Sequence, residues 1–325
     1  MSGETLPVEF ACVFDGKGGA RTLSAAELAA WQPDDGILWV DINLTLDRSR
    51  DWLVEEGGAD IAALDILLAG ETRPRFLSTD NGLVLVIRAV NLHPGADPED
   101  MVAVRMWVSK DRIITSRRRR VLSVDDIGRA LLKGEGPRSS GGFVVEAIET
   151  TTDRIGTVVD DIGDEMDDLD SRTGSDDVIL LRQDLADLRR QVASVRRFLA
   201  PQRDALDRVY RLPGGFLSNE DALQLREEAD RLTRYVEDLD LAREHALVIQ
   251  EEMLNRVAQE QNQRIYLLSV VAAIFLPLTF VTGLLGMNVA GLPGTASPYG
   301  FTVSVVVMIF LGIGLIMLFK MKKWI

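Results

Sequence analysis

The sequence predicts a mixed α/β domain, then long helices, then two membrane-spanning helices at the C-terminal end. Segments rich in Val, Ile and aromatic residues within the first 120 residues indicate strands. From Phe143 onward these strand signals vanish, and apolar residues recur at helical spacing. The final sixty residues are almost free of charge and contain two long apolar runs, which is typical of membrane spans.

Composition sets limits on the class of protein. The chain has 325 residues, of which 46% are hydrophobic and 26% charged, which is far from the composition of a disordered protein. A net charge of −14 argues against a nucleic-acid partner and suits a protein that meets cations. A single cysteine and two histidines exclude a disulfide scaffold, a cysteine-rich zinc site and a three-histidine metal centre within one chain.

The first domain is expected to span residues 1–135. Its predicted strands lie at 7–14, 37–42, 83–92, 101–109 and 112–117, and its predicted helices lie near 45–56 and 60–69. With one further helix, of no assigned range, between the first two strands, the expected order is β-α-β-α-α-β-β-β, which indicates a mixed α/β domain. The glycine- and serine-rich segment Gly134–Gly142 is expected to be a loop or boundary.

Residues 143–218 are expected to form a helical hairpin region, with helices at 143–169 and 177–199 joined by a polar turn at 171–175. A stalk helix at 219–264 follows, with Ser218 as its N-cap. An apolar seam recurs along it with the a/d spacing of helices packed side by side, and we expect it to contribute to association between copies of the chain. Its members are Leu225, Leu232, Tyr235, Leu239, Ala242, Ala246, Ile249 and Met253.

Two uncharged runs follow the stalk, at 265–285 and 301–319, and a 15-residue uncharged loop at 286–300 joins them. The first run would be roughly 31 Å long as a helix, enough to cross a bilayer core. Buried helices of a soluble core are the alternative, which two adjacent runs disfavour. Arg264 precedes the first run and lysines occupy the tail at 320–325, so both termini are expected to be cytoplasmic. A single chain with only two spans cannot enclose a pathway through the membrane. Several copies around an axis can, so we expect an oligomer.

Gly286-Met287-Asn288 follows the first run directly, and this arrangement resembles the CorA metal-ion transporter superfamily. The segments at 277–279 and 290–294 resemble its ZntB-type zinc transporter branch, and further likeness lies at 71–75, 100–105, 115–119 and 199–204. The resemblance implies a funnel-shaped homopentamer in a bacterial inner membrane, with the first span lining the pore. It implies transport of divalent cations, zinc by proton-coupled uptake in the first place, with magnesium, cobalt or nickel as alternatives.

The candidate pathway combines this signature with one face of the first span. Carbonyls of Gly286 and Met287 and the amide of Asn288 would meet the hydrated ion with oxygen dipoles. Pore-lining positions recur every three or four residues, with apolar constrictions at Ile265, Leu268 and Leu276; helix-to-helix packing is the alternative role for each. The predicted face comprises Asn262, Ile265, Leu268, Ala272, Leu276, Thr279 and Gly283.

Charged residues outside the predicted spans are further candidates for binding metal ions or other partners, with less support than the pore-lining positions. Seven carboxylates in eleven residues, with no basic residue among them, form either a solvated helix tip or a cation reservoir: Asp160, Asp161, Asp164, Glu165, Asp167, Asp168 and Asp170. The resemblance also implies metal sensing near Glu251. Arg117–Arg120 is expected to be a solvated edge or a partner of that acidic segment, or less often a lipid or nucleotide contact. His93 and His245 are each isolated.

Two departures from the superfamily bear on selectivity. Leu285 stands where the magnesium branch has an aromatic residue, and the loop at 289–300 has no carboxylate. Selection is therefore expected to act through oxygen contacts and pore size. A membrane-tethered coiled-coil sensor is the second hypothesis. An enzyme is disfavoured because no nucleophile–base set or phosphate-binding glycine loop is evident, and no resident cofactor is expected.

Overall fold

The computed structural model describes residues 7–91, 95–97, 99–174, 178–212, 215–287, 292 and 297–322. It divides into two compact units, Met1–Gln250 and Glu251–Ile325. The finer division into domains made from the sequence stays a prediction.

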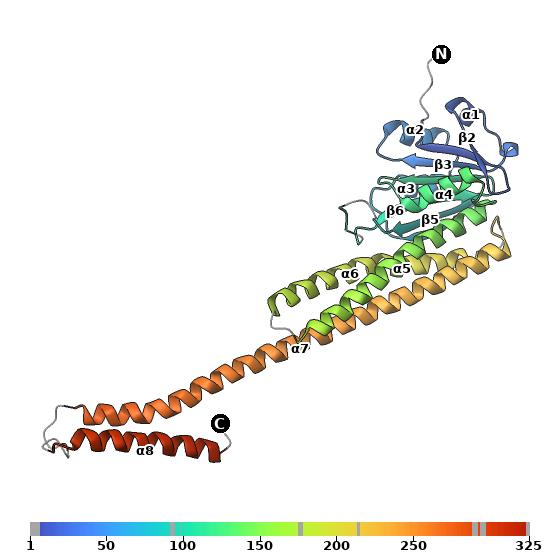
Figure 1. Ribbon diagram of the computed structural model, residues 1–325. Coiled ribbons are helices and arrows are strands. Elements are labelled where there is room, and N and C mark those ends of the chain that lie inside the picture. The colour runs from blue at the N-terminus through green and yellow to red at the C-terminus, as the bar shows by residue number, and fades with distance from the viewer. Residues whose placement is uncertain are drawn as a thin grey trace. The chain divides into compact units, whose positions relative to one another are not determined.

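The first unit is built on a seven-stranded mixed sheet in the order β2-β1-β3-β7-β6-β5-β4 (Figure 1). The pair β3–β7 is parallel and the other neighbouring pairs are antiparallel. Because β6 lies inside the sheet between β7 and β5, all eight of its residues are buried. The strands are β1 (Phe10–Phe14), β2 (Ala20–Thr22), β3 (Leu38–Asn43), β4 (Arg75–Thr79), β5 (Gly82–Ala89), β6 (Val102–Ser109) and β7 (Arg112–Arg117).

Helices cover the two faces of this sheet. On one face α2 (Asp47–Glu55) and α3 (Ile61–Leu68) pack onto β3, β5, β6 and β7 in an apolar core that includes Trp52, Leu67 and Trp107. On the other face lie α4 (Leu122–Lys133) and α5 (Ser140–Arg172), where the rings of Trp39 and Phe143 stand 5.0 Å apart. The short α1 (Ala25–Ala30) and a 3₁₀ turn (Pro33–Asp35) connect β2 to β3.

The strands β2 and β4 and the helix α4 were not expected from the sequence, α6 (Val178–Val209) ends at Val209 and not at 199, and the start of α5 differs. β2 has only three residues, and β4 is a mostly exposed edge strand, so neither shows an apolar pattern that sequence analysis could recognise. α5 begins at Ser140, inside the segment expected to be a loop, because the Ser139 hydroxyl accepts a hydrogen bond from the amide of Gly142 at 2.9 Å. Among the described residues no strand follows β7, as expected.

Three helices of the first unit pack alongside one another: α5, α6 (Val178–Val209) and the first part of α7 (Asn219–Leu285) (Figure 1). Ion pairs join α7 to both partners, Arg231 to Asp153 at 2.6 Å and Arg196 to Asp240 at 2.6 Å. Ser218 caps α7, as predicted, since its hydroxyl accepts from the amide of Asp221 at 3.1 Å.

The apolar seam of α7 is buried within a single chain. Leu225, Leu232, Leu239 and Ala246 are each 0% exposed. The expectation that this seam contributes to association between copies is therefore wrong, because α5 and α6 of the same chain already cover it. Tyr235 is half-buried, and the neighbouring Val236 takes the buried position.

The second unit contains the end of α7 and the helix α8 (Gly300–Met321), which lies beside it (Figure 1). Both helices are long and apolar enough to cross a membrane, and the apolar stretch of neither is buried inside the chain.

The single cysteine offers a test of the sheet core. Burial raises the pKa of the Cys12 thiol to about 12, and the side chain is 0% exposed. Because the thiolate is the reactive form, we expect a maleimide near neutral pH to leave the folded chain unlabelled and to label one thiol per chain after denaturation. The control is Ser78→Cys on the exposed edge strand β4, which should label in the folded chain. Rapid labelling of folded wild type would contradict the buried position of Cys12.

Candidate functional site

The end of α7 carries the glycine of the predicted signature. The amide of Gly286 donates to the carbonyl of Thr282 at 2.9 Å, so the helical hydrogen bonding runs one residue past Leu285. A Cβ at Gly286 would lie 3.1 Å from that same oxygen, a close approach that a glycine avoids. Met287 is 49% exposed. Asn288 lies outside the described residues.

The predicted pore face of α7 is exposed along its whole length. Leu276 is 74% exposed and Leu268 is 68% exposed, and the remaining five positions of the face are exposed too. The half-buried positions of the same stretch are Val270, Ala273, Ile274, Pro277, Leu278 and Val281. At 3.6 residues per turn these two sets are centred about half a turn apart. One face of this stretch is thus partly covered within the chain and the opposite face is free.

A cavity of about 500 Å³ between α7 and α8 shows which side α8 occupies. Phe280, Val281, Leu284 and Leu285 line it from α7, and Gly300, Val303, Ser304 and Val307 from α8. Its described lining holds no charged group, and the Ser304 hydroxyl donates to the carbonyl of Gly300 at 2.9 Å. This cavity has few polar groups that could replace the hydration shell of an ion. It is therefore a space left by the packing of the two helices and not an ion path.

Polar groups on the exposed face of α7 are few. The hydroxyls of Ser269 and Thr282 donate to carbonyls of their own helix, Ile265 and Thr279, each at 2.9 Å. The side-chain hydroxyl of Thr279 takes part in no hydrogen bond among the described residues. It is therefore available to water or to a hydrated ion.

The acidic segment of α5 is exposed at all seven carboxylates. Basic neighbours come from outside the segment, because Asp168 pairs with Arg172 at 3.1 Å and Asp170 lies 3.7 Å from His245. The described residues contain no group of three or more His, Cys, Asp or Glu side chains that could hold a metal ion, and Glu251 is exposed on α7. These carboxylates supply a diffuse negative field.

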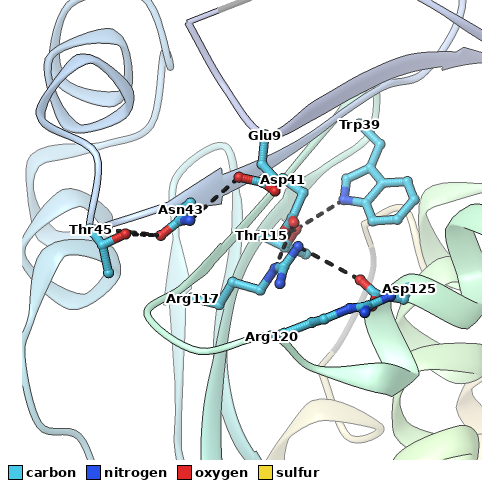
Figure 2. A network of polar contacts seen from close by, with 9 residues as sticks. All are labelled: Glu9, Trp39, Asp41, Asn43, Thr45, Thr115, Arg117, Arg120 and Asp125. Carbon is cyan, nitrogen blue, oxygen red and sulfur yellow. Dashed lines mark hydrogen bonds and ion pairs between the residues drawn. The ribbon is translucent and has the colours of Figure 1, made fainter.

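Arg117 has a different role from the one expected. It lies in a buried polar network at the end of β3 and β7 (Figure 2), where its Nε lies 2.7 Å from Oδ2 of Asp41. The Thr115 hydroxyl donates to Asp41 at 2.7 Å and accepts from the indole of Trp39 at 3.1 Å. Arg117 also lies 3.6 Å from Asp125. It is therefore paired inside the fold and is neither a solvated edge nor a partner of the acidic segment of α5.

Electrostatics of this pair follow from its burial. Burial raises the pKa of the Asp41 carboxyl, and the positive charge of Arg117 opposes that rise. For Arg117, burial alone would lower the pKa, and the charge of Asp41 reverses the effect, so that its pKa is raised. The charge of each side chain therefore favours the ionised form of the other.

The residues after Arg117 border two cavities. Arg118 and Arg119 are exposed, and they line a cavity of about 560 Å³ beside Asp41 and a second cavity of about 630 Å³ beside Arg88 and Arg105. Sequence analysis missed Arg88 and Arg105. Each is the single charged residue of an otherwise largely apolar strand, β5 or β6, and that is the signal that points to them.

Comparison with known proteins identifies the family. Residues 34–323 match the model of the CorA-like Mg²⁺ transporter protein family, and the chain belongs to this family of membrane metal-ion transporters. The divalent cation transporter CmaX of Pseudomonas aeruginosa is 34% identical over 92% of this chain and 91% of its own. The zinc transport protein ZntB of Pectobacterium carotovorum is 32% identical over 95% of this chain and 94% of its own.

The fold agrees with that assignment. The solved structure of the full-length CmaX protein aligns with a TM-score of 0.83 at 32% identity and covers 100% of both chains. The predicted fold class is thus confirmed: an α/β N-terminal part, a long helix and two apolar C-terminal helices.

The Asp41–Arg117 pair yields a stability prediction. Asp41→Asn leaves a largely buried guanidinium with only the more distant carboxylate of Asp125, 3.6 Å away, so we expect the N-terminal unit to lose about 3 kcal/mol of unfolding free energy. The double variant Asp41→Asn with Arg117→Met should lose less, because it removes both charges. Denaturant unfolding of the purified chain, followed by circular dichroism, measures both.

The matched control for that measurement is Asp187→Asn, which breaks the exposed pair between Asp187 and Arg190 on α6 and should change stability little. Equal losses in the single and the double variant would show that the charges of Asp41 and Arg117 are not coupled.

Proposed function

We propose that the chain transports divalent metal ions, zinc in preference to magnesium, cobalt or nickel, through a central pore formed by a homopentamer. It lies in a bacterial inner membrane with both termini in the cytoplasm and the loop at 286–300 outside. Its partners are further copies of itself, the lipid bilayer and the transported ion, which is cargo and not a resident cofactor. Neither an enzymatic activity nor a nucleic-acid partner is part of the proposal.

The observation that carries the proposal is the free face of α7 that leads to the Gly286-Met287-Asn288 signature. Since α8 packs near the opposite face, copies of α7 are free to meet one another around an axis along the face that bears Leu276 and Thr279. In that arrangement α8 lies outside the ring. A helix that served only as an anchor would need neither a polar signature at its end nor an uncharged loop after it.

Along the proposed pore, the groups that would contact the ion are uncharged oxygen atoms. The run at 265–285 and the loop at 289–300 contain no carboxylate, cysteine or histidine, so tetrahedral zinc ligation inside the pore is not available. Amide, carbonyl and hydroxyl oxygens that meet a hydrated ion would lower its dehydration cost. Zinc is favoured because the similar ZntB proteins are zinc transporters by name. The CmaX relative, named for divalent cations, keeps the wider range of ions as the second candidate.

The exposed carboxylates of the first unit support cation transport in a second way. A field from Asp160, Asp161, Asp164, Glu165, Asp167 and Asp168 raises the local concentration of divalent cations without binding them tightly. Salt screens such a field over about 8 Å at physiological ionic strength. Regulation by cytoplasmic metal near Glu251 belongs to the same proposal.

Flux assays test the proposed activity. The purified chain in proteoliposomes should carry zinc, magnesium, cobalt and nickel at measurable and unequal rates, each recorded with and without a pH gradient. A dependence of zinc uptake on the gradient supports proton coupling. A correctly assembled protein that carries none of these ions would support the tethered-sensor alternative.

The signature amide has its own test. Asn288→Ala should abolish flux while the oligomer still assembles, because the amide would replace part of the hydration shell of the ion. Gln263→Ala is the control, since it removes an amide from the opposite side of α7 just before the apolar run. Flux gives the result, and light scattering after size exclusion checks assembly. Wild-type flux in assembled Asn288→Ala would refute the assignment.

The apolar constriction yields a further prediction. Leu276→Ser should raise basal flux, because a ring of hydroxyls wets more readily than a ring of leucines. Leu278→Ser makes the same change on the half-buried side of α7 and should not raise flux. If both variants behave alike, the assignment of the pore face is wrong.

A further inference from the structure

The cavity beside β5 and β6 is lined by an unusual number of cations. It measures about 630 Å³ and lies in the N-terminal unit between the ends of these strands, the segment after α3 and helix α6. Five guanidinium groups line it: Arg88, Arg105, Arg118, Arg119 and Arg197. Among the described residues none of the five forms an ion pair with a carboxylate, whereas Arg117 next to them forms two.

Arg105 is the innermost of these groups. It lies on β6 opposite Val86 of β5 and Ser116 of β7, and it is 2% exposed. Its Nη2 donates to the carbonyl of Gly70 at 2.9 Å, and its Nε has no hydrogen-bond partner in the described part of the chain. Burial, with the charges of Arg88 and Arg118, lowers its pKa to about 10. It therefore remains a cation at neutral pH, buried and without a counter-ion.

Arg88 is held beside it in a fixed position. Alternation along the antiparallel strands places Arg88 on the same sheet face as Arg105, since Arg88 pairs with Ala103. Its Nη1 and Nη2 donate to the carbonyls of Met101 at 2.8 Å and Thr72 at 2.6 Å, and its Nε has no partner among the described residues. The guanidinium lies 4.5 Å from the ring centroid of Phe198 on α6.

The same ring anchors a third cation. Arg197 of α6 lies 4.8 Å from the centroid of Phe198, so two guanidinium groups share one aromatic ring. Three carboxylates also line the cavity, but Glu71 and Asp100 are exposed and Glu99 is half-buried. The carboxylates are thus more accessible to solvent than Arg105, and the buried end of the cavity is positive.

A buried charge without a counter-ion costs several kcal/mol, and folded proteins compensate such a charge with a partner. The planar guanidinium fork matches the oxygens of a phosphate group, to which it donates two parallel hydrogen bonds. We infer that this cavity binds a phosphate group, with Arg105 and Arg88 as its inner ligands and Arg118, Arg119 and Arg197 around it. The phosphate comes either from free inorganic phosphate or from a nucleotide.

Titration calorimetry on the purified full-length chain in detergent tests the inference, with inorganic phosphate and ATP as separate probes. The buffer is free of divalent metal, and sodium chloride holds the ionic strength constant, because exposed arginines also attract any anion. We expect saturable binding of one ligand per chain. ATP that binds about tenfold more tightly than phosphate identifies a nucleotide site, and equal affinities identify a site for the phosphate group alone.

Arg105→Gln should weaken the binding of either probe by about tenfold or more. Arg182→Gln, an exposed arginine of α6 outside the cavity, is the control and should leave binding unchanged. Because Arg105 is buried, a second variant joins two exposed changes, Arg118→Gln with Arg197→Gln, and should weaken binding in a folded chain. The absence of saturable binding, or unchanged affinity in the folded variants, would overturn the inference.

Discussion

The helix α7 packs against other helices of the chain in its first part and is apolar enough to cross a membrane in its last part. Much of the architecture depends on the continuity of this one helix. A backbone inside a bilayer must satisfy its hydrogen bonds internally, so an unbroken helix is the form available to a spanning segment. α7 meets this condition, since it continues from Asn219 to Leu285 and includes Pro277 without ending. The first part of α7 packs an apolar seam against α5 and α6. The last part is an apolar helix with one exposed face.

The covered seam changes the way in which assembly has to be understood. Leu225, Leu232 and Leu239 are already buried inside one chain, so they are not available to hold copies together. The proposed oligomer therefore has to rely on other surfaces, and the exposed face of α7 that carries Leu276 is the one that the proposed pore uses. The negative charge of the chain, −14 in total, opposes close approach of copies unless cations or salt screen it.

Two arginines at the same end of the sheet differ in whether the chain supplies a counter-ion for their buried charge. Arg117 is neutralised by Asp41 and Asp125, with Thr115 and Trp39 fixing the carboxylate (Figure 2). Arg105, on the other sheet face, has a carbonyl partner and cationic neighbours. The first arrangement is complete within the chain, and the second is completed by an anion from outside.

The sequence by itself determined the elements whose evidence is local. Uncharged runs of 21 and 19 residues identify α8 and the end of α7, the absence of Gly and Pro from Glu220 to Leu276 indicates one long helix, and Ser218 marks its start. The Gly286-Met287-Asn288 signature indicated the family. These features depend on hydropathy, propensity and short-range hydrogen bonds, which act between residues near in sequence.

The tertiary structure alone decided which partners those residues meet. The spacing of Leu225 and Leu239 predicts a helix interface, but whether the partner is α5 of the same chain or a second copy depends on contacts between distant segments. Likewise the run Arg117–Arg120 looks like a solvated edge, and only strand pairing brings Asp41 to Arg117 and Arg118 near Arg105. Such pairings join residues far apart in sequence, and no local pattern encodes them.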